Sequence, residues 1–224
     1  MSQRSLLFLA LVIFALSANC QSISRVFYMR LPDARSASHF ERNKNSLEPE
    51  QAGYLEACLV DLNSISYSVK KMPDGEIFAF GATAKGSRGL SLYFSDLKLT
   101  GESHLNIYDG SGSLIQTITS ADLNDSPLFA TADVDDDSLM VELFVSNGSK
   151  VVAKIESVGV LFSSVSRDFG HAGTCEVPIN CVEGSNWQTL KKGVVRIRLV
   201  RGGMMYWCTG SLINNTAQNN TPYI

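Results

Sequence analysis

Short apolar segments separated by turn residues, between Gly75 and Phe162, are the feature that most constrains the fold of this chain. The segments with the length and composition of β-strands are 76–80, 90–94, 105–108, 114–118, 139–145 and 150–162. The turn Asp109-Gly110-Ser111-Gly112 predicts a hairpin. The Asn147-Gly148 turn predicts that its two flanking segments also pair with each other. Six or more short strands, evenly spaced, predict an all-β fold, namely a β-sandwich of the jelly-roll kind.

Composition excludes several other classes of protein. The chain has 224 residues, of which 45% are hydrophobic and 18% charged, as in ordinary globular proteins. The formal net charge is -3, and Arg196, Arg198 and Arg201 alternate with apolar residues instead of forming a basic cluster. We therefore expect no nucleic-acid partner.

The N-terminus has the pattern of an export signal. Arg4 precedes an unbroken apolar run of eleven residues, Leu6–Leu16. This run is shorter than the roughly 20 residues that a membrane-spanning helix needs, but it suits a signal peptide covering residues 1–20. Lipidation of Cys20 is the alternative, and Asn19 disfavours it. No second apolar stretch has membrane length, so we expect a secreted product with no membrane partner after signal cleavage.

Residues 21–74 give a mixed signal, and we predict an N-terminal pro-segment. A short helix from about Leu47 to Leu59 fits Ser46 as its cap and Pro49 in its first turn. Residues 59–69 fit a strand equally well.

The composition changes at 163–173, a small and polar stretch that predicts an exposed linker. Beyond it, Val195, Ile197 and Leu199 alternate with arginines, which predicts a strand whose apolar face is buried. A turn at Gly202-Gly203 then returns the chain as a hairpin. Roughly fifty residues with an odd number of cysteines are too few to close a core. We therefore expect the second domain, residues 174–224, to be truncated.

The candidate ligand residues give weak signals. The Cys175-x5-Cys181 spacing is not a zinc pattern, and no histidine follows at ligand distance, so we predict no metal there and no cofactor. Cysteine content fits an oxidising compartment, in which disulfides form. Asp133 and Asp135–Asp137 could bind calcium, but they lack the EF-hand spacing, so a solvated turn is favoured.

The C-terminal residues resemble a known family. The pattern Cys175-x5-Cys181-x-Glu183-Gly184-x-x-Trp187, with Cys208-Thr-Gly-Ser-Leu-Ile-Asn-Asn-Thr-Ala further on, resembles the start of the mature domain of bacterial lysyl endopeptidases, which are trypsin-like serine proteases. Segments 90–99 and 105–109 are similar to the β-rich pro-region of the family's secreted members.

The resemblance implies a domain order and an activity. Residues 1–20 would be the signal peptide, 21–74 the pro-segment, 75–162 the β-sandwich pro-region, 163–173 the linker, and 174–224 the first hairpin of an incomplete trypsin-like barrel. The catalytic triad would lie beyond Ile224, so that this chain has no catalytic residue and no activity of its own. The full-length enzyme would be a monomer that cleaves protein substrates, with lysine or arginine before the scissile bond as the preference that the resemblance suggests.

The resemblance also implies roles for individual residues. Cys175, Cys181 and Cys208 would form disulfides with cysteines later in the full-length protein, whereas Cys58 has no counterpart. The processing region would contain Arg167 and Gly170. The competing hypothesis is a secreted β-sandwich that serves as a binding or adhesion module without enzymatic activity, which residues 75–162 alone would also support.

Overall fold

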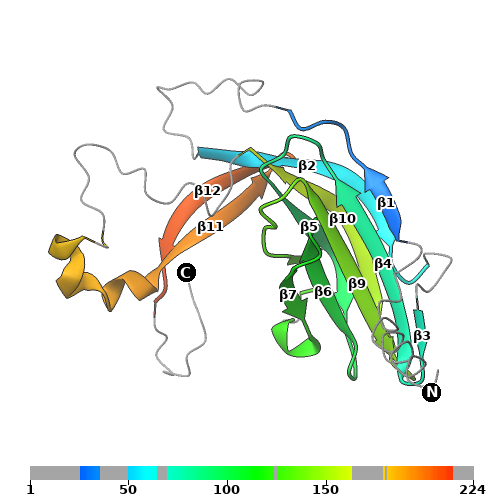
Figure 1. The fold of residues 1–224 in the computed structure, drawn as a ribbon. Coiled ribbons are helices and arrows are strands. Elements are labelled where there is room, and N and C mark those ends of the chain that lie inside the picture. Colours follow the sequence, from blue (N-terminus) through cyan, green and yellow to red (C-terminus); the bar gives the residue numbers. More distant parts are fainter. Residues whose placement is uncertain are drawn as a thin grey trace, which may run out of the picture.

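The computed structural model of the 224-residue chain describes residues 26–35, 50–64, 70–123, 126–162, 179 and 181–213, to which all structural statements below refer. These residues form two β-sheets that face each other, and a long hairpin projects from one of them (Figure 1). Both sheets are open, and the described strands close no barrel. The all-β prediction is therefore confirmed.

Sheet A has the strand order β1-β4-β9-β6-β7, with β3 paired to β4 as well. Its strands are β1 (Phe27–Arg30), β3 (Lys70–Met72), β4 (Gly75–Thr83), β6 (His104–Asp109), β7 (Leu114–Ile118) and β9 (Ser138–Ser146). The pairing of β1 with β4 is parallel, and the other pairings are antiparallel. The predicted hairpin around Asp109–Gly112 is present as β6 and β7.

Sheet B has the order β11-β12-β2-β10-β5-β8, with every pairing antiparallel. Its strands are β2 (Glu50–Asp61), β5 (Gly89–Lys98), β8 (Phe129–Ala130), β10 (Val152–Leu161), β11 (Val194–Arg201) and β12 (Met204–Ser211). Three 3-10 helices lie outside the sheets, at Ser120–Asp122, Val182–Trp187 and Leu190–Gly193.

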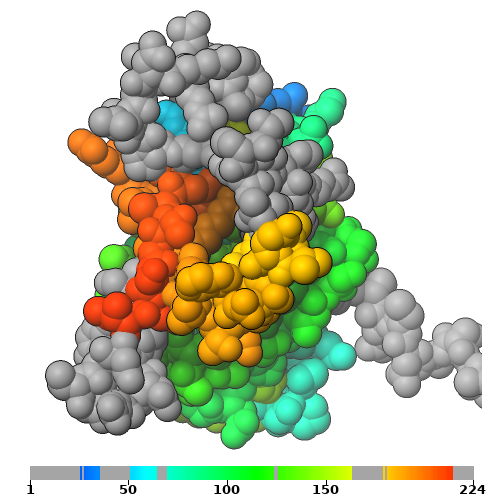
Figure 2. Space-filling view, turned by 90° about the vertical axis from the view of Figure 1, so that its left-hand side faces the viewer, coloured from blue at the N-terminus to red at the C-terminus, as the bar shows by residue number. Residues whose placement is uncertain are grey.

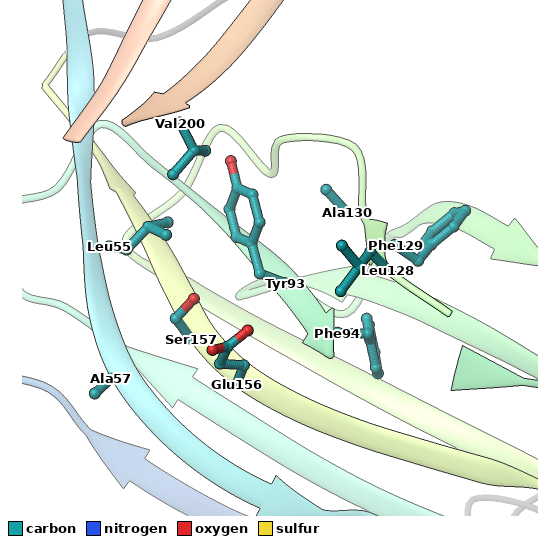
Figure 3. A pocket seen from close by; sticks show the side chains of 10 residues that line it. All are labelled: Leu55, Ala57, Tyr93, Phe94, Leu128, Phe129, Ala130, Glu156, Ser157 and Val200. Atoms are coloured by element: carbon teal, nitrogen blue, oxygen red, sulfur yellow. The ribbon is translucent and has the colours of Figure 1, made fainter. Parts of the chain in front are cut away.

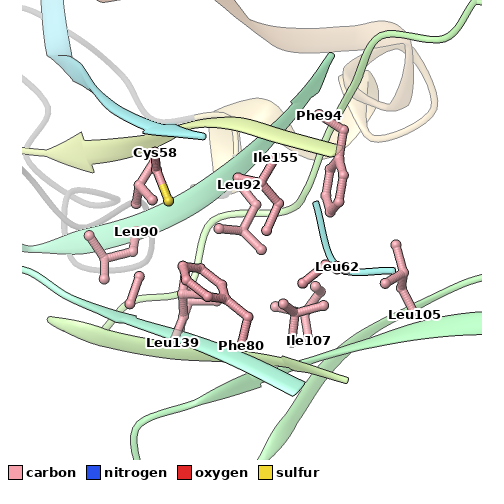
Figure 4. Packing of buried hydrophobic residues seen from close by; sticks show 14 of the residues in the cluster. Cys58, Leu62, Phe80, Leu90, Leu92, Phe94, Leu105, Ile107, Leu139 and Ile155 are labelled. Atoms are coloured by element: carbon pink, nitrogen blue, oxygen red, sulfur yellow. The ribbon is translucent and has the colours of Figure 1, made fainter. Parts of the chain in front are cut away.

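Alternating residues from both sheets fill the core (Figure 4). In β5, Leu90, Leu92 and Phe94 point inward, while Ser91 and Tyr93 point to the outer face of sheet B. Phe80 of sheet A is fully buried opposite them. Burying one such large apolar side chain stabilises the fold by about 1.5–3 kcal/mol. We use "the sandwich" for the described part of residues 26–162.

Two local predictions are wrong. The helix proposed for 47–59 is not formed, because residues 50–61 are strand β2, which pairs with β10 along most of its length. The segments that flank Asn147-Gly148 do not pair with each other either. β9 pairs with β4 and β6 in sheet A, whereas β10 pairs with β2 and β5 in sheet B. The turn therefore carries the chain from one sheet to the other.

The predicted C-terminal hairpin is formed by β11 and β12, and its turn is Gly202-Gly203, where φ is +58° and +77°. These left-handed angles strongly favour glycine. The hairpin does not stand apart from the sandwich, because β12 pairs with β2 and so extends sheet B. Whether residues 174–224 belong to a separate domain stays a prediction.

The predicted burial of the hairpin's apolar face holds only in part, because Val195 and Ile197 are half-buried but Leu199 is not. Leu199, on the face expected to be buried, is 45% exposed, whereas the Arg198 side chain is only 14% exposed. Near the turn, the opposite face lies against the sandwich, because acceptors for Arg198 lie on the sandwich and Met205 of the same face fills a space there. Farther from the turn, Arg196 of this face is exposed. The hairpin's open end projects away with two of the 3-10 helices (Figure 1), so that these helices (gold) are nearest the viewer in Figure 2.

Candidate functional site

Strand β12 is joined to β2 by backbone pairing close to the hairpin's turn. The aligned residues are Met204 with Tyr54, Met205 with Gly53, Tyr206 with Gln51 and Trp207 with Glu50. The pairing also reaches the turn itself, where the Leu55 N–H donates a 2.8 Å hydrogen bond to the Gly203 carbonyl. We call this contact between hairpin and sandwich, together with the side chains described next, the seam.

Met205 is the apolar anchor of the seam. Its side chain is fully buried and lies over two glycines of the sandwich, Gly53 and Gly159. A Cβ atom at residue 53 would stand 2.7 Å from the Met205 Cε, and one at residue 159 would stand 3.1 Å from its Sδ. Met205 thus packs closely over both glycines, and a side chain at residue 53 would collide first with the backbone carbonyl of Val160. The Tyr93 hydroxyl donates to the same sulfur at 3.2 Å.

Arg198 is the polar anchor. Its guanidinium forms an ion pair with Asp133, and both side chains are only 14% exposed. The guanidinium also donates to the Ser91 hydroxyl and to the Thr131 carbonyl, each at 3.3 Å. It lies 5.3 Å from the centre of the Tyr93 ring. The two anchors thus share Tyr93, which stands between them on the outer face of sheet B.

Burial dominates the electrostatics of the seam. Desolvation raises the pKa of Asp133 above its ordinary value, although the charge and the hydrogen bond of Arg198 act in the opposite direction. Desolvation also raises the pKa of Tyr93, again against the effect of Arg198. Because a buried carboxylate without a partner is costly, Asp133 needs Arg198 more than an exposed aspartate would.

A cleft of about 650 Å³ adjoins the seam (Figure 3). Its floor is the outer face of sheet B, including Leu55 and Tyr93, and Leu128 and Val200 lie on opposite sides of it. Most of the lining is apolar, with Glu156 as its one charged side chain. The hairpin therefore contacts the sandwich at the seam and leaves open space beside it.

The structure places only some of the predicted site residues. Cys181 and Cys208 are exposed free thiols, while Cys175, Arg167 and Gly170 lie outside the described residues, as do the predicted signal peptide and linker. The predicted disulfides therefore remain untested.

Two predictions for side chains can be resolved further. Cys58 is a core residue, and burial raises the pKa of its thiol to about 11.

The prediction that the aspartates at 133–137 lie in a solvated turn is wrong for Asp133, because its side chain is buried against Arg198. Among the described residues, no three or more His, Cys, Asp or Glu side chains are grouped as metal ligands.

The seam was not found from the sequence. In the sequence, Asp133 belongs to an acidic turn and Arg198 to the polar side of a predicted strand. Their partnership spans 65 residues and leaves no local pattern. Gly53 and Gly159 gave a partial signal, because an isolated glycine within a strand often marks a close approach of other atoms.

Comparison with known proteins shows which family the hairpin resembles. Residues 169–224 match the family described as lysyl endopeptidase, C-terminal domain. This C-terminal segment is related to the lysyl endopeptidases. The matched residues include all of β11 and β12, so one side of the seam is lysyl endopeptidase-related and the other is the sandwich. A search of curated proteins finds no match. No helix among the described residues is both long and apolar enough to span a membrane.

Proposed function

We propose that this chain is the N-terminal part of a secreted serine endopeptidase precursor, in which the sandwich is the pro-region and residues 174–224 begin the catalytic domain. Two observations support the protease assignment: the match of residues 169–224 to the lysyl endopeptidases and the cysteine and glycine pattern within it. The apolar run at 6–16 supports export through a signal peptide.

The seam is the single observation that carries the precursor assignment. A pro-region must hold a part of the catalytic domain by specific contacts, and here β2 and Asp133 of the sandwich hold β12 and Arg198 of the protease-related segment. In this role the sandwich supports the folding of the hairpin and keeps the protease silent.

Exposed apolar side chains give the assignment further support. Of the large hydrophobic side chains that are exposed among the described residues, most lie in the matched segment: Ile179, Val182, Trp187, Leu190, Val194, Leu199, Val200, Leu212 and Ile213. In monomeric proteins such a concentration of exposed apolar surface marks a contact with another structure. We propose that the remainder of the catalytic domain covers it.

In the full-length enzyme we expect hydrolysis of peptide bonds, and the resemblance suggests a preference for cleavage after lysine or arginine. A serine attacks the carbonyl, a histidine accepts its proton, an aspartate orients the histidine, and backbone amides bind the oxyanion. The resemblance assigns none of these groups to a residue of this chain. The described residues therefore contribute positioning of the hairpin and not chemistry.

The first experiment asks whether this chain is active. We expect the purified chain to hydrolyse none of a panel of fluorogenic peptides with lysine or arginine before the scissile bond. A mature lysyl endopeptidase in the same buffer is the positive control. Turnover that a serine-reactive inhibitor abolishes would show that the chain contains its own triad. Reading the coding sequence beyond Ile224 tests whether the rest of the precursor carries the catalytic triad. We expect a Leu-Thr-Ala-x-His-Cys segment there.

The second experiment locates processing. We expect brief digestion with trypsin, followed by mass spectrometry, to give its first cut within 163–173, after Arg167. The hairpin's Arg198 is protected by its burial in the seam, so it should be cut much later. First cuts within 90–160 would place the boundary elsewhere.

A further inference from the structure

We propose that the seam is a self-sufficient docking site, so that the sandwich binds the protease-related hairpin even when no peptide bond connects them. The partner is defined by its chemistry: a β-hairpin that presents an arginine and a methionine on one face and a free backbone edge. The proposal rests on the proposed function and extends it, because it makes the released pro-region a non-covalent partner of the protease.

The sandwich core does not depend on the hairpin. Every buried member of the main core cluster lies between Leu31 and Val160, and the hairpin adds to it only the partly buried Met204, which packs against its edge. Met205 belongs instead to a separate small cluster with Ala52 and Leu161. Removing the hairpin would uncover this small cluster and leave the main core filled. The two parts therefore meet as two surfaces and not as one continuous core.

The docking surface on the sandwich is specific in shape and charge. Gly53 and Gly159 leave a recess that accepts the unbranched Met205 side chain. Asp133 supplies a buried carboxylate for a guanidinium, and the Ser91 hydroxyl and Thr131 carbonyl accept its other hydrogen bonds. Such a set of acceptors suits the several N–H donors of arginine better than the single ammonium of lysine.

Arg198 and Met205, the two anchors, lie close together on the same face of the hairpin. Arg198 lies across from Trp207, and the next pair on the same face is Val200 with Met205. One face of a hairpin thus carries both anchors, while the outer edge of β12 supplies the backbone groups that pair with β2. Strand addition to a sheet edge with side-chain pockets is a known mode of peptide recognition.

The cleft beside the seam makes the contact separable. Val200 borders open space rather than packed side chains, so the hairpin can leave without opening the sandwich. After processing, the sandwich would remain on the arginine face of the hairpin until dilution or digestion removes it. The hairpin's other face, with Leu199, stays available to the rest of the catalytic domain while the sandwich is bound.

The test uses the full chain. A recognition sequence for a sequence-specific protease is inserted within 163–173, the purified protein is cut under native conditions with a reductant present, and the products are run on size exclusion at micromolar concentration. We expect the two halves of the otherwise wild-type chain to elute together. Arg198→Met and Met205→Ala should weaken the complex by roughly 30- to 1000-fold, so that their halves separate.

Matched controls separate docking from folding. Arg201→Met removes an exposed arginine from the same strand, and Asp137→Asn neutralises an exposed aspartate near Asp133; both cut proteins should stay together like the wild type. The two halves of the cut Asp133→Asn protein should separate. Circular dichroism of each uncut variant checks that the sandwich is folded, and only folded variants are compared.

Separation of the wild-type halves, or an Arg198→Met complex as tight as the wild type, would overturn the proposal. Separation of the wild-type halves would leave the precursor assignment standing, because the contact at the seam can still form within one uncut chain. Conversely, a coding sequence without a triad would end the precursor assignment, and the cut halves would still elute together if the docking site is real.

Discussion

Replacing Arg198 and Asp133, singly and together, tests whether the ion pair of the seam is energetically coupled. The variants are Arg198→Met, which keeps an unbranched apolar stem but removes the charge, Asp133→Leu, and the double variant. Each single change leaves one member of the pair facing a site from which most water is excluded, because both side chains are 14% exposed. The double variant leaves neither charge behind.

The expected magnitudes follow from this burial. Breaking a buried ion pair from one side costs about 3–5 kcal/mol, whereas exposed pairs contribute about 0–1 kcal/mol. We expect Arg198→Met to lower the free energy of undocking the hairpin by about 3 kcal/mol, because Asp133 is left without its strongest partner. Asp133→Leu should cost about 2 kcal/mol, since Arg198 keeps Ser91 and Thr131 as acceptors. The double variant should also cost about 2 kcal/mol, which gives a coupling energy of about 3 kcal/mol.

Urea titration measures these values through the fluorescence of Trp207. Trp187 is replaced by phenylalanine in all variants so that only the hairpin's tryptophan reports, and Trp187 is suitable because it is 55% exposed. Trp207 packs against the small cluster that contains Ala52 and Leu161 of the sandwich, so its ring is sensitive to displacement of the hairpin. Arg201→Met is the control and should change stability by no more than about 0.5 kcal/mol. A coupling energy below about 0.5 kcal/mol would refute the reasoning, because that is the range of solvent-exposed pairs.

Two further predictions concern glycine and cysteine. Gly53→Ala should destabilise the chain by about 1–3 kcal/mol in the same titration, because its Cβ would collide with the neighbouring strand and the methionine anchor. Gly193→Ala, where a Cβ meets nothing within 4 Å, should change stability by less than about 0.5 kcal/mol, and equal effects would contradict the close-packed recess. At pH 8, iodoacetamide should modify Cys181 and Cys208 in the folded chain but Cys58 only after denaturation. Burial raises the pKa of Cys58 to about 11, which leaves about 0.1% as thiolate at that pH, and mass spectrometry showing equal labelling would contradict its place in the core.

The strands of the sandwich were predictable because their signals are local. In β5 the inward Leu90 and Leu92 alternate with Ser91 and Tyr93, and this period of two is imposed by strand geometry whatever the strand pairs with. The turn at Gly202-Gly203 was predictable for the same reason, since two consecutive positive φ angles favour glycine. The match to the lysyl endopeptidases likewise rests on residues that lie close together in the sequence.

Pairing partners were less predictable. The Asn147-Gly148 turn has the composition of a hairpin, yet β9 and β10 enter different sheets, because each gains two antiparallel neighbours by doing so. The segment at 47–59 has few strand signals of its own, and its pairing with β10 decided its conformation. Intrinsic preferences are weak compared with a full ladder of backbone hydrogen bonds.

The sequence by itself determined that this protein is all-β and carries a lysyl endopeptidase-related hairpin, because alternation, turn glycines and motif spacing act over a few residues. Only the tertiary structure decided which face of that hairpin is covered. Burying the apolar face, with Leu199, would have satisfied the alternation. Near the turn, Arg198 and Met205 of the opposite face are covered instead, because a buried carboxylate, Asp133, and a recess over two glycines lie on the sandwich there. A charge buried beside an opposite charge can be more favourable than its exposure, and the position of that opposite charge is set by the fold.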